Sequence, residues 1–523
     1  MVNPNSTDKV LHINTTSDAK TIPDGDMVEG GTKPDVNKVD PPKRGGRRVL
    51  LNTGAMAGSS LWRILVSFLL QALVTRQLGF AALGQYTVAL AYLNVSQIIA
   101  EMGLQGLLVR ELAQNRGHRR QYFMLALWLQ IGAGFLIWLG LWWLTKLLPY
   151  SDTMANLLWL IGGTLPFYAV TVACQMLFQG CERMELVMFV ELIINSLIGL
   201  LSILVLFMDG TVVDLVLILI VTQALSAGFC ILLVWYFQLL THPDQTTPSQ
   251  PDKAVAPSVL LKRALPFYGL SLADVLLQRL DIILLSAIGG DVLTGIYSAA
   301  YNVVRVFLKL IQSFWKGLYP TLSRLFQQTP QRYNQLCQMS LQYGLLLLFL
   351  VAPVGAGLAT VLLNLLYKSP SAESVAAFEI LIWVIPLFLV ELYAITLMMV
   401  ENRTGYSLLL MIVHLLAVAL LLPIFTSLGQ AFGTALAVLL ASMIGTVASL
   451  VMLQHFKMPR VPSGTYLILL PASVAAIAIT YLPAPLPLQI SSGIGIYLVL
   501  LPLCGIYTCR NLKALRDMMF RPG

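Results

Sequence analysis

The sequence predicts an all-helical protein that crosses a membrane many times. Of its 523 residues, 57% are hydrophobic and only 11% are charged. A water-soluble chain of this size needs more charge than this to stay in solution. Apolar runs of about 18–25 residues recur between residues 50 and 507, each long enough to cross a ~30 Å hydrocarbon layer. Together these observations predict a polytopic α-helical membrane protein.

The N-terminal segment differs from the rest of the chain. Residues 1–49 are polar, rich in Asp, Asn, Thr, Lys and Pro, and contain no apolar run. Such a segment cannot bury enough surface to offset its ordering entropy, so we expect a disordered tail and not a signal peptide. The basic cluster of Lys43, Arg44, Arg47 and Arg48 is expected to hold it on the cytoplasmic side.

Fourteen membrane spans follow, by the length of the apolar runs. The run at 335–366 is too long for one straight crossing, so we expect Pro353 and Gly355 to kink or tilt it. The spans are 53–77, 84–106, 122–146, 154–178, 187–208, 213–238, 265–288, 294–318, 335–366, 377–399, 406–425, 430–454, 464–482 and 488–508.

The loop charges predict the orientation. Most basic residues fall in loops on the side of the N-terminus, whereas the opposite side holds only Arg76, Lys146 and Lys368. Positive loops stay in the cytoplasm, so we expect an even number of spans in the cytoplasmic (inner) membrane with both termini cytoplasmic. The net charge of +8 therefore reflects membrane topology and does not indicate nucleic acid.

One long connection divides the chain. Residues 241–258 are rich in Pro, Gln and Thr and lack periodicity, which is typical of a flexible cytoplasmic linker. We therefore expect an N-lobe at 50–240 with spans 1–6 and a C-lobe at 259–456 with spans 7–12. Residues 457–523 would add spans 13 and 14 and a cytoplasmic C-terminal tail. The outer loops are too short for a catalytic domain.

Two short patterns occur once on each side of the linker. Gly79-x4-Gly84-x-Tyr86-x2-Ala89 returns 211 residues later as Gly290-x4-Gly295-x-Tyr297-x2-Ala300. Pro166-x16-Arg183 returns 220 residues later as Pro386-x16-Arg403. An even number of spans in each unit makes the repeats parallel, with a central cavity between two six-helix lobes and two extra helices outside them.

The candidate site is a positive stripe on span 294–318. Arg305, Lys309, Gln312 and Lys316 fall at i, i+4, i+7 and i+11, which is one face of a helix. Ionisable groups in mid-membrane are costly and normally face a cavity or a partner, so this stripe predicts an anionic substrate. Lys316 lies near the cytoplasmic end, where simple snorkelling is the alternative interpretation.

Other mid-span charges extend this prediction. Arg63 and Arg279 are further candidates for binding the anion, although Arg279 could instead form a structural pair with a neighbouring helix. Asp274 and Asp281 share a face of span 265–288 with Gln278, and we expect them to serve in ion coupling or charge pairing. Glu191, Glu391 and His414 are interpreted as helix-packing groups, with a proton relay as the alternative for His414.

The six cysteines and five histidines are scattered, with no C-x-x-C pair. This pattern indicates neither a disulfide framework nor a metal site. We therefore expect no metal, no cofactor and no catalytic residue.

Several motifs in order make the chain similar to the O-antigen and oligosaccharide flippase family, within the superfamily of multidrug, oligosaccharidyl-lipid and polysaccharide exporters. The resemblance covers roughly residues 50–508, and the polar tail at 1–49 is not part of it. The motifs are Arg76-Gln77-Leu78-Gly79 with Gly84-Gln85-Tyr86, Glu101-Met102-Gly103-Leu104, Arg110-Glu111-Leu112-Ala113, Gln179-Gly180-Cys181-Glu182-Arg183-Met184, Leu265-Pro266-Phe267, Arg279-Leu280-Asp281 with Gly295-Ile296-Tyr297, and Leu318-Tyr319-Pro320-Thr321-Leu322-Ser323.

The resemblance implies a flippase that moves a polyprenyl-diphosphate-linked oligosaccharide, such as an O-antigen unit for lipopolysaccharide, by alternating access. Its partners would be that substrate, membrane lipids and other polysaccharide-assembly membrane proteins, and it would act as a monomer. A cation-coupled multidrug extruder of the same fold is the first alternative, but the Arg/Lys stripe argues against organic cations. A membrane glycan polymerase or ligase is the second, and the short outer loops disfavour it.

Overall fold

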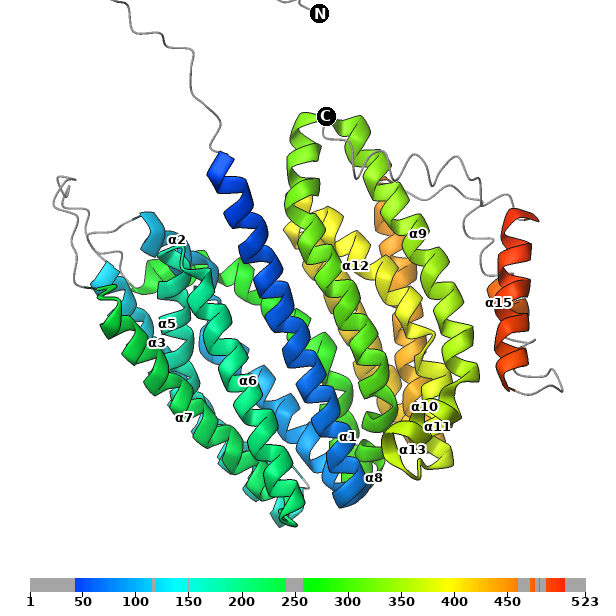
Figure 1. The fold of residues 1–523 in the computed structure, drawn as a ribbon, viewed down its shortest axis with the longest axis horizontal. Coiled ribbons are helices and arrows are strands. Elements are labelled where there is room, and N and C mark those ends of the chain that lie inside the picture. Colours follow the sequence, from blue (N-terminus) through cyan, green and yellow to red (C-terminus); the bar gives the residue numbers. More distant parts are fainter. Residues whose placement is uncertain are drawn as a thin grey trace, which may run out of the picture. The chain divides into compact units, whose positions relative to one another are not determined.

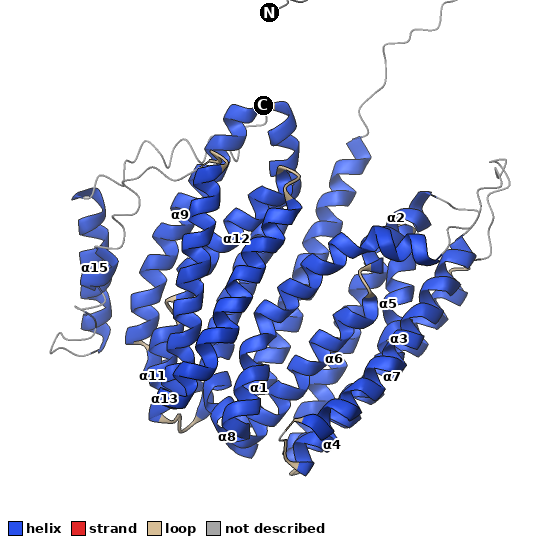
Figure 2. Ribbon diagram, turned by 180° about the vertical axis from the view of Figure 1, so that it is seen from behind, coloured by secondary structure: helices blue, strands red, loops and turns tan. Residues whose placement is uncertain are grey.

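The computed structural model describes residues 43–114, 119–148, 150–240, 257–459, 471–475, 479 and 486–503. The fold described below is that of the compact unit formed by residues 50–523. Most of the predicted tail, most of the linker at 241–258 and most of the span at 464–482 lie outside the described residues. In the part that is described, the ordered elements are helices and no strand occurs (Figure 2).

Figure 1 shows α2–α7 gathered on one side of this unit and α9–α13 on the other, with α1 and α8 between them. The described helices are α1 (Lys43–Glu101), α2 (Leu104–Gln114), α3 (Arg119–Leu147), α4 (Asp152–Gly162), α5 (Leu165–Gly180), α6 (Met184–Phe207), α7 (Val212–Tyr236), α8 (Pro257–Gln328), α9 (Pro330–Gly357), α10 (Ala359–Tyr367), α11 (Ala372–Leu381), α12 (Val384–Val400), α13 (Thr404–His455) and α15 (Leu486–Leu503).

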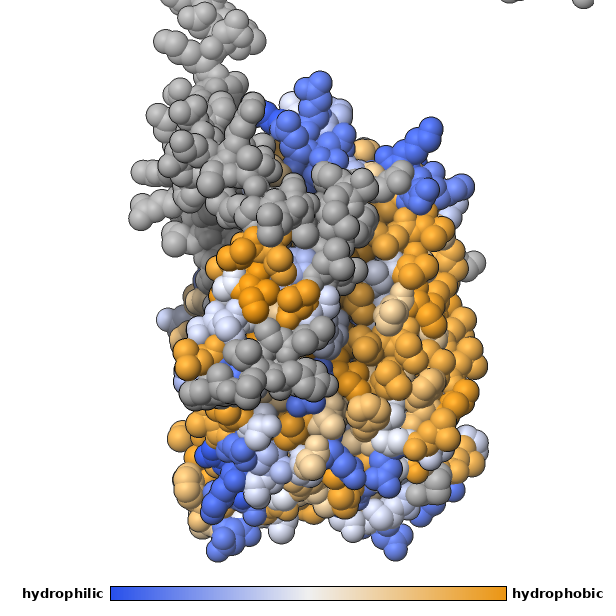
Figure 3. Space-filling model, turned by 90° about the vertical axis from the view of Figure 1, so that its right-hand side faces the viewer, coloured by the Kyte–Doolittle hydropathy of each residue, from blue (hydrophilic) through white to orange (hydrophobic). Residues whose placement is uncertain are grey.

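The membrane prediction is confirmed at the level of fold class. Among the described residues, nine helical segments are long and apolar enough to cross a membrane. Three of them, α1, α8 and α13, bend sharply inside and each corresponds to two predicted spans. Figure 3 shows hydrophobic residues across the middle of one face and hydrophilic residues near both ends. The total of fourteen spans stays a prediction.

Glycine permits two of these bends. The backbone φ angle is 87° at Gly79 and 71° at Gly290, in the region that a side chain disfavours. At these residues the chain turns back, so that each of α1 and α8 has two limbs, as Figure 1 shows for α1. The third bend, in α13, falls at Gly429 and Gln430.

Proline breaks two of the predicted spans into two helices each. The 154–178 span divides between α4 and α5, and the 377–399 span divides between α11 and α12. A proline ring clashes with the carbonyl four residues earlier, which places the breaks just before Pro166 and Pro386. The 335–366 span divides at Leu358, beyond the expected kink at Pro353 and Gly355.

The span expected at 84–106 ends earlier, at Glu101, because Met102 and Gly103 both have positive φ. The short helix α2 follows, although no span was predicted there. Its Leu104, Leu108 and Leu112 recur every four residues and are buried, so one face of α2 packs into the core of the first half.

The internal repeat is visible in the local geometry. Glu182 and Asn402 have φ of 59° and 58°, and each ends a helix just before an arginine. The guanidinium of Arg183 lies 4.4 Å from the Phe237 ring centroid, and that of Arg403 lies 4.2 Å from the Phe456 ring centroid. The two halves thus use the same cation–π contact to close the same turn.

The N-termini of two helices, one in each half, are also capped in the same way. The Ser151 hydroxyl accepts a hydrogen bond from the Met154 N–H at 3.2 Å, and 220 residues later the Ser371 hydroxyl accepts one from the Ser374 N–H at 3.1 Å. Each serine caps a helix by satisfying a backbone donor that has no partner inside the helix. The parallel repeat predicted from two short patterns therefore extends to capping and turn geometry.

The two halves meet at the bends of α1 and α8. A methyl group on Gly84 would overlap the Asp291 carbonyl, and one on Gly295 would overlap the Phe80 carbonyl. These two contacts are the same contact with the halves exchanged, because Gly295 and Asp291 are the repeat counterparts of Gly84 and Phe80, each 211 positions later. The Gln85 side-chain amide also donates to the Asp291 carboxylate at 2.9 Å. The halves are therefore sealed together at one end of the membrane region.

This seal predicts an unequal effect of two glycine substitutions. Gly84→Ala should lower the free energy of unfolding by about 1–3 kcal/mol, because the added methyl group forces the two bends apart. Gly228→Ala is the matched control, since a Cβ there meets no neighbouring atom and alanine favours a helix. Thermal unfolding of the purified protein in detergent measures both, and equal melting temperatures for the two variants would contradict the seal.

Candidate functional site

A cavity of about 400 Å³ lies between the two halves. Its walls come from both limbs of α1, from α6 and α7, and from both limbs of α8. The volume falls in the range of roughly 300–1,000 Å³ that is typical of small-molecule sites. The bends of α1 and α8 bring the two halves into contact at one end. The limbs of these helices diverge from the bends, and the cavity lies between them.

Five basic side chains line this cavity: Arg63, Arg279, Arg305, Lys309 and Lys316. All five are sequence-predicted site residues. Arg63 comes from the first limb of α1, Arg279 from the first limb of α8, and the others from its second limb. No aspartate or glutamate is among the described residues that line the cavity. The formal charges of its described lining are therefore all positive.

Neutral polar side chains fill the remaining polar positions of the cavity wall. Gln312, the predicted fourth member of the stripe, is one of them. The others are Ser60, Ser67, Gln71, Thr87, Asn94, Asn195, Gln278, Asn302 and Ser313. Amides and hydroxyls can each donate and accept hydrogen bonds, which suits a ligand rich in hydroxyl groups.

Two cations of the stripe, Arg305 and Lys309, interact with neutral side chains. The Lys309 ammonium donates to the side-chain oxygens of Gln278 and, at 3.1 Å, of Gln312. The Arg305 guanidinium donates from Nη1 to the Asn302 side-chain oxygen at 3.2 Å and lies 4.8 Å from the Tyr301 ring centroid. Its Nε and Nη2 are buried and have no hydrogen-bond partner in the described part of the chain.

The stripe also lacks a carboxylate partner. Within the described ranges, the ion pairs are Arg403 with Glu401 at 3.6 Å and His414 with Glu391 at 2.7 Å. Neither involves Arg305 or Lys309. A buried cation without a carboxylate at ion-pair distance is costly, and it keeps its capacity to bind an incoming anion.

The two predicted carboxylates lie elsewhere. Asp274 and Asp281 line a second, smaller pocket of about 70 Å³ on the other side of the α8 limbs, inside the second half. Asp281 is 4% exposed, and its Oδ2 accepts a hydrogen bond from the Tyr297 hydroxyl at 2.7 Å. Neither carboxylate lines the large cavity. Their roles in ion coupling or charge pairing stay predictions.

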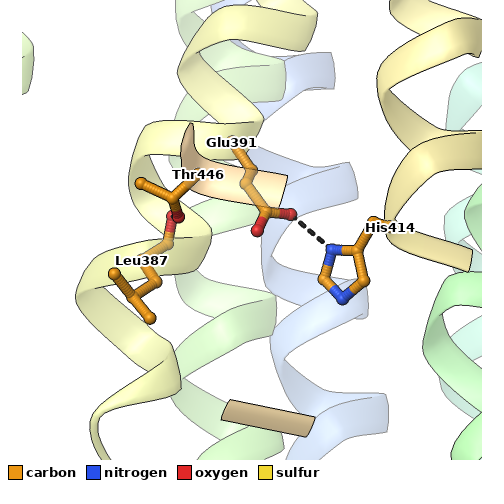
Figure 4. Close-up of polar contacts among 4 residues, drawn as sticks. All are labelled: Leu387, Glu391, His414 and Thr446. Atoms are coloured by element: carbon orange, nitrogen blue, oxygen red, sulfur yellow. Dashed lines mark hydrogen bonds and ion pairs between the residues drawn. The ribbon is translucent and has the colours of Figure 1, made fainter. Parts of the chain in front are cut away.

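Figure 4 shows an ion pair that sequence analysis missed. His414 of α13 and Glu391 of α12 line the small pocket together, with His414 Nδ1 2.7 Å from Glu391 Oε2. Both had been interpreted as separate packing groups. The one signal in the sequence is an ionisable residue in the middle of each of two consecutive spans, and a separation of 23 residues does not reveal that they face each other.

The family comparison matches residues 49–326 to a family described as "Polysaccharide biosynthesis protein". This stretch covers more than half of the chain and includes all eight predicted site residues. The comparison with curated proteins returned no significant match.

Solved structures share the fold over most of the chain. A structure titled "Lipid II flippase MurJ, inward closed conformation" matches with a TM-score of 0.67 and 14% identity, covering 86% of this chain and 97% of that one. An inward-facing multidrug resistance MATE family transporter of the MOP superfamily matches with a TM-score of 0.61 and 13% identity, covering 76% and 95%.

A third match is a MOP superfamily transporter from Pyrococcus furiosus, whose title states that the reverse polarity of its binding pocket suggests a different function. Its TM-score is 0.57 at 14% identity, covering 77% of this chain and 95% of that one. All three structures are named as transporters or flippases. At these identities the similarity shows that the fold is shared.

Because the stripe is unpaired, removing its charge should stabilise the protein. Arg305→Met and Lys309→Met should each raise the free energy of unfolding by about 1–3 kcal/mol, because each removes a positive charge that has no carboxylate within ion-pair distance in the described residues. Arg403→Met is the control, because it loses an ion pair and a cation–π contact and should destabilise by up to about 1 kcal/mol. Melting temperatures in detergent provide the measurement, and a loss of stability in all three variants would contradict this account.

Proposed function

Because the chain belongs to the family of polysaccharide biosynthesis proteins, we propose that it is a flippase for a polyprenyl-diphosphate-linked oligosaccharide. The substrate would cross the cytoplasmic membrane by alternating access, for the synthesis of a cell-surface polysaccharide such as an O-antigen. The fold is one that solved flippases and transporters share.

One observation carries the proposal: five basic side chains and no carboxylate among the described residues that line the cavity. A diphosphate offers several anionic oxygens, and guanidinium groups can bind such oxygens in a bidentate manner. Arg305 is the best placed, since its Nε and Nη2 have no hydrogen-bond partner among the described residues. The Lys309 ammonium would exchange its hydrogen bonds to the Gln278 and Gln312 side chains for a bond to an anionic oxygen of the diphosphate.

The rest of the substrate also fits this environment. The hydroxyl groups of a glycan would bind to the side-chain amides and hydroxyls of the cavity wall, among them Asn94 and Asn195. The polyprenyl tail does not need a polar cleft and would remain in the bilayer. The polar head alone would then pass between the halves.

Alternating access would separate the halves at the seal near Gly84 and Gly295. In this proposal residues 50–240 and 259–456 are the lobes that rock against each other, joined by the linker at 241–258. Residues 457–523 form the two additional spans and the C-terminal tail. Both termini would be cytoplasmic, and the protein would act as a monomer alongside other polysaccharide-assembly proteins.

A multidrug extruder is the second candidate, because the fold is shared with a multidrug resistance transporter. An extruder of organic cations requires negative charge in its cavity, which the lining residues do not supply. Competition in detergent should separate the two: inorganic pyrophosphate should displace a fluorescent polyprenyl-diphosphate glycan, and tetraphenylphosphonium should not. Displacement by the cation alone would favour the extruder.

The flippase hypothesis predicts a loss of transport in two variants. Arg305→Gln and Lys309→Gln should each slow translocation at least about tenfold, because each removes a charge-assisted hydrogen bond to the headgroup. Arg183→Gln is the control, since that arginine stacks on Phe237 outside the cavity. The assay reconstitutes the protein in vesicles and scores the accessibility of the fluorescent glycan on each leaflet. Wild-type rates in both cavity variants would overturn the assignment.

A further inference from the structure

The Glu391–His414 pair lies in the small pocket inside the second half, and the transport cavity does not contain it. The two side chains are 7% and 13% exposed, so the pair is shielded from solvent. Glu391 Oε2 is bound to His414 Nδ1 at 2.7 Å (Figure 4). Glu391 Oε1 is buried and has no hydrogen-bond partner in the described part of the chain. A buried carboxylate oxygen without a partner is costly unless it has a use.

Gly445 of α13 shapes this arrangement. A Cβ at that position would lie 2.5 Å from Glu391 Oε1. A side chain there would displace the Glu391 carboxylate, so the glycine lets this carboxylate lie close to α13 beside His414.

The pocket wall is shared with the transport cavity. Gln278, Arg305, Lys309 and Gln312 line both spaces. The charged and titratable groups that face the pair from α8 are Asp274, Asp281, Tyr301, Arg305 and Lys309; α12 adds only Glu391, and α13 adds only His414 beside the neutral Ser442. Two cations thus stand between the carboxylates of the pocket and any anion in the cavity.

The chemistry of this pocket suits a proton better than a metal ion. Arg305 and Lys309 would repel a metal cation, and among the described residues no group of three His, Cys, Asp or Glu could hold one. The pocket volume of about 70 Å³ exceeds the roughly 10–15 Å³ that one water molecule needs. Water can therefore deliver a proton to the pair, and histidine is the side chain that ordinarily exchanges one near neutral pH.

We propose that Glu391 and His414 form a proton-binding site whose occupancy controls the affinity of the cavity for an anionic headgroup. With His414 neutral and Glu391 ionised, the pair carries one negative charge. A proton from water forms an N–H bond on the imidazole, and the pair becomes neutral overall. The link to the headgroup rests on the proposed function; the proton site itself does not.

The sign of the coupling follows from electrostatics. A negative charge on the pair lowers the positive potential that Arg305 and Lys309 produce in the cavity. Neutralising the pair therefore raises that potential. An anion should therefore bind more tightly when the pair is protonated. Linkage is reciprocal, so binding of the headgroup should draw a proton onto the pair.

Two measurements on the full-length protein test the coupling. The fluorescent polyprenyl-diphosphate glycan is titrated at several pH values, and proton uptake on binding is followed with a pH indicator in weak buffer. For the wild type, the apparent Kd should fall by up to about tenfold per pH unit as the pair becomes protonated, with uptake of up to one proton. His414→Gln keeps a hydrogen-bond donor but cannot be charged, so both responses should vanish.

Two further variants sharpen the result. His455→Gln is the matched control, because this exposed histidine lies on the same helix away from the pocket and its loss should change nothing. Gly445→Ala retains both titratable groups but displaces Glu391, so it should shift the pH at which the affinity changes. Wild-type pH dependence in both His414→Gln and Gly445→Ala would overturn the proposal.

A measurement without substrate separates this proposal from the flippase hypothesis. Histidine-selective NMR of the protein in nanodiscs identifies the His414 resonance by its loss in His414→Gln. The resonance should titrate, with a midpoint that moves in Gly445→Ala. A resonance that never titrates would refute the proton site. If His414 titrates as expected but the glycan does not bind at any pH, the flippase hypothesis fails and the proton site stands.

Discussion

The cost of a positive charge in a membrane interior constrains this protein more than any other interaction. Arg305 and Lys309 are held by amides and a tyrosine ring, and neither forms an ion pair with a carboxylate in the described part of the chain. A positive charge that is removed from water reduces the stability of the folded protein unless another group compensates for the lost solvation. In the proposed function, an anionic headgroup would bring the missing negative charge into the cavity between the halves.

The repeat determines how that cavity arises. Gly84 and Gly295 bring the bends of α1 and α8 into backbone contact at one end, and the limbs diverge from there. Two halves built on the same plan meet symmetrically, but the charges are not symmetric. The first half contributes Arg63 alone, whereas α8 supplies the other four cations. A symmetric scaffold thus carries an asymmetric site, and the titratable pocket of the second half lies directly behind it.

Much of the candidate site was predictable because helical periodicity is a local property. Arg305, Lys309, Gln312 and Lys316 were assigned to one face from their spacing, and all four line the cavity. Asp274 and Asp281 share a helix with Arg279, yet only Arg279 lines the cavity, because the rotation of that limb depends on its neighbours. The Glu391–His414 contact joins two helices, so no periodic spacing in the sequence reveals it. The sequence analysis noted both residues but did not predict that they form a pair.

By itself, the sequence determined that the chain is a many-helix membrane protein with an internal parallel repeat and a cationic stripe, since hydrophobic length, short-range spacing and turn residues act locally. Only the tertiary structure decided that the halves are in contact at the bends of α1 and α8. It also decided that, among the described residues, the stripe has no carboxylate at ion-pair distance, and that a second pocket adjoins it. Those features depend on which faces of distant helices meet, and that choice is made by packing across the whole core.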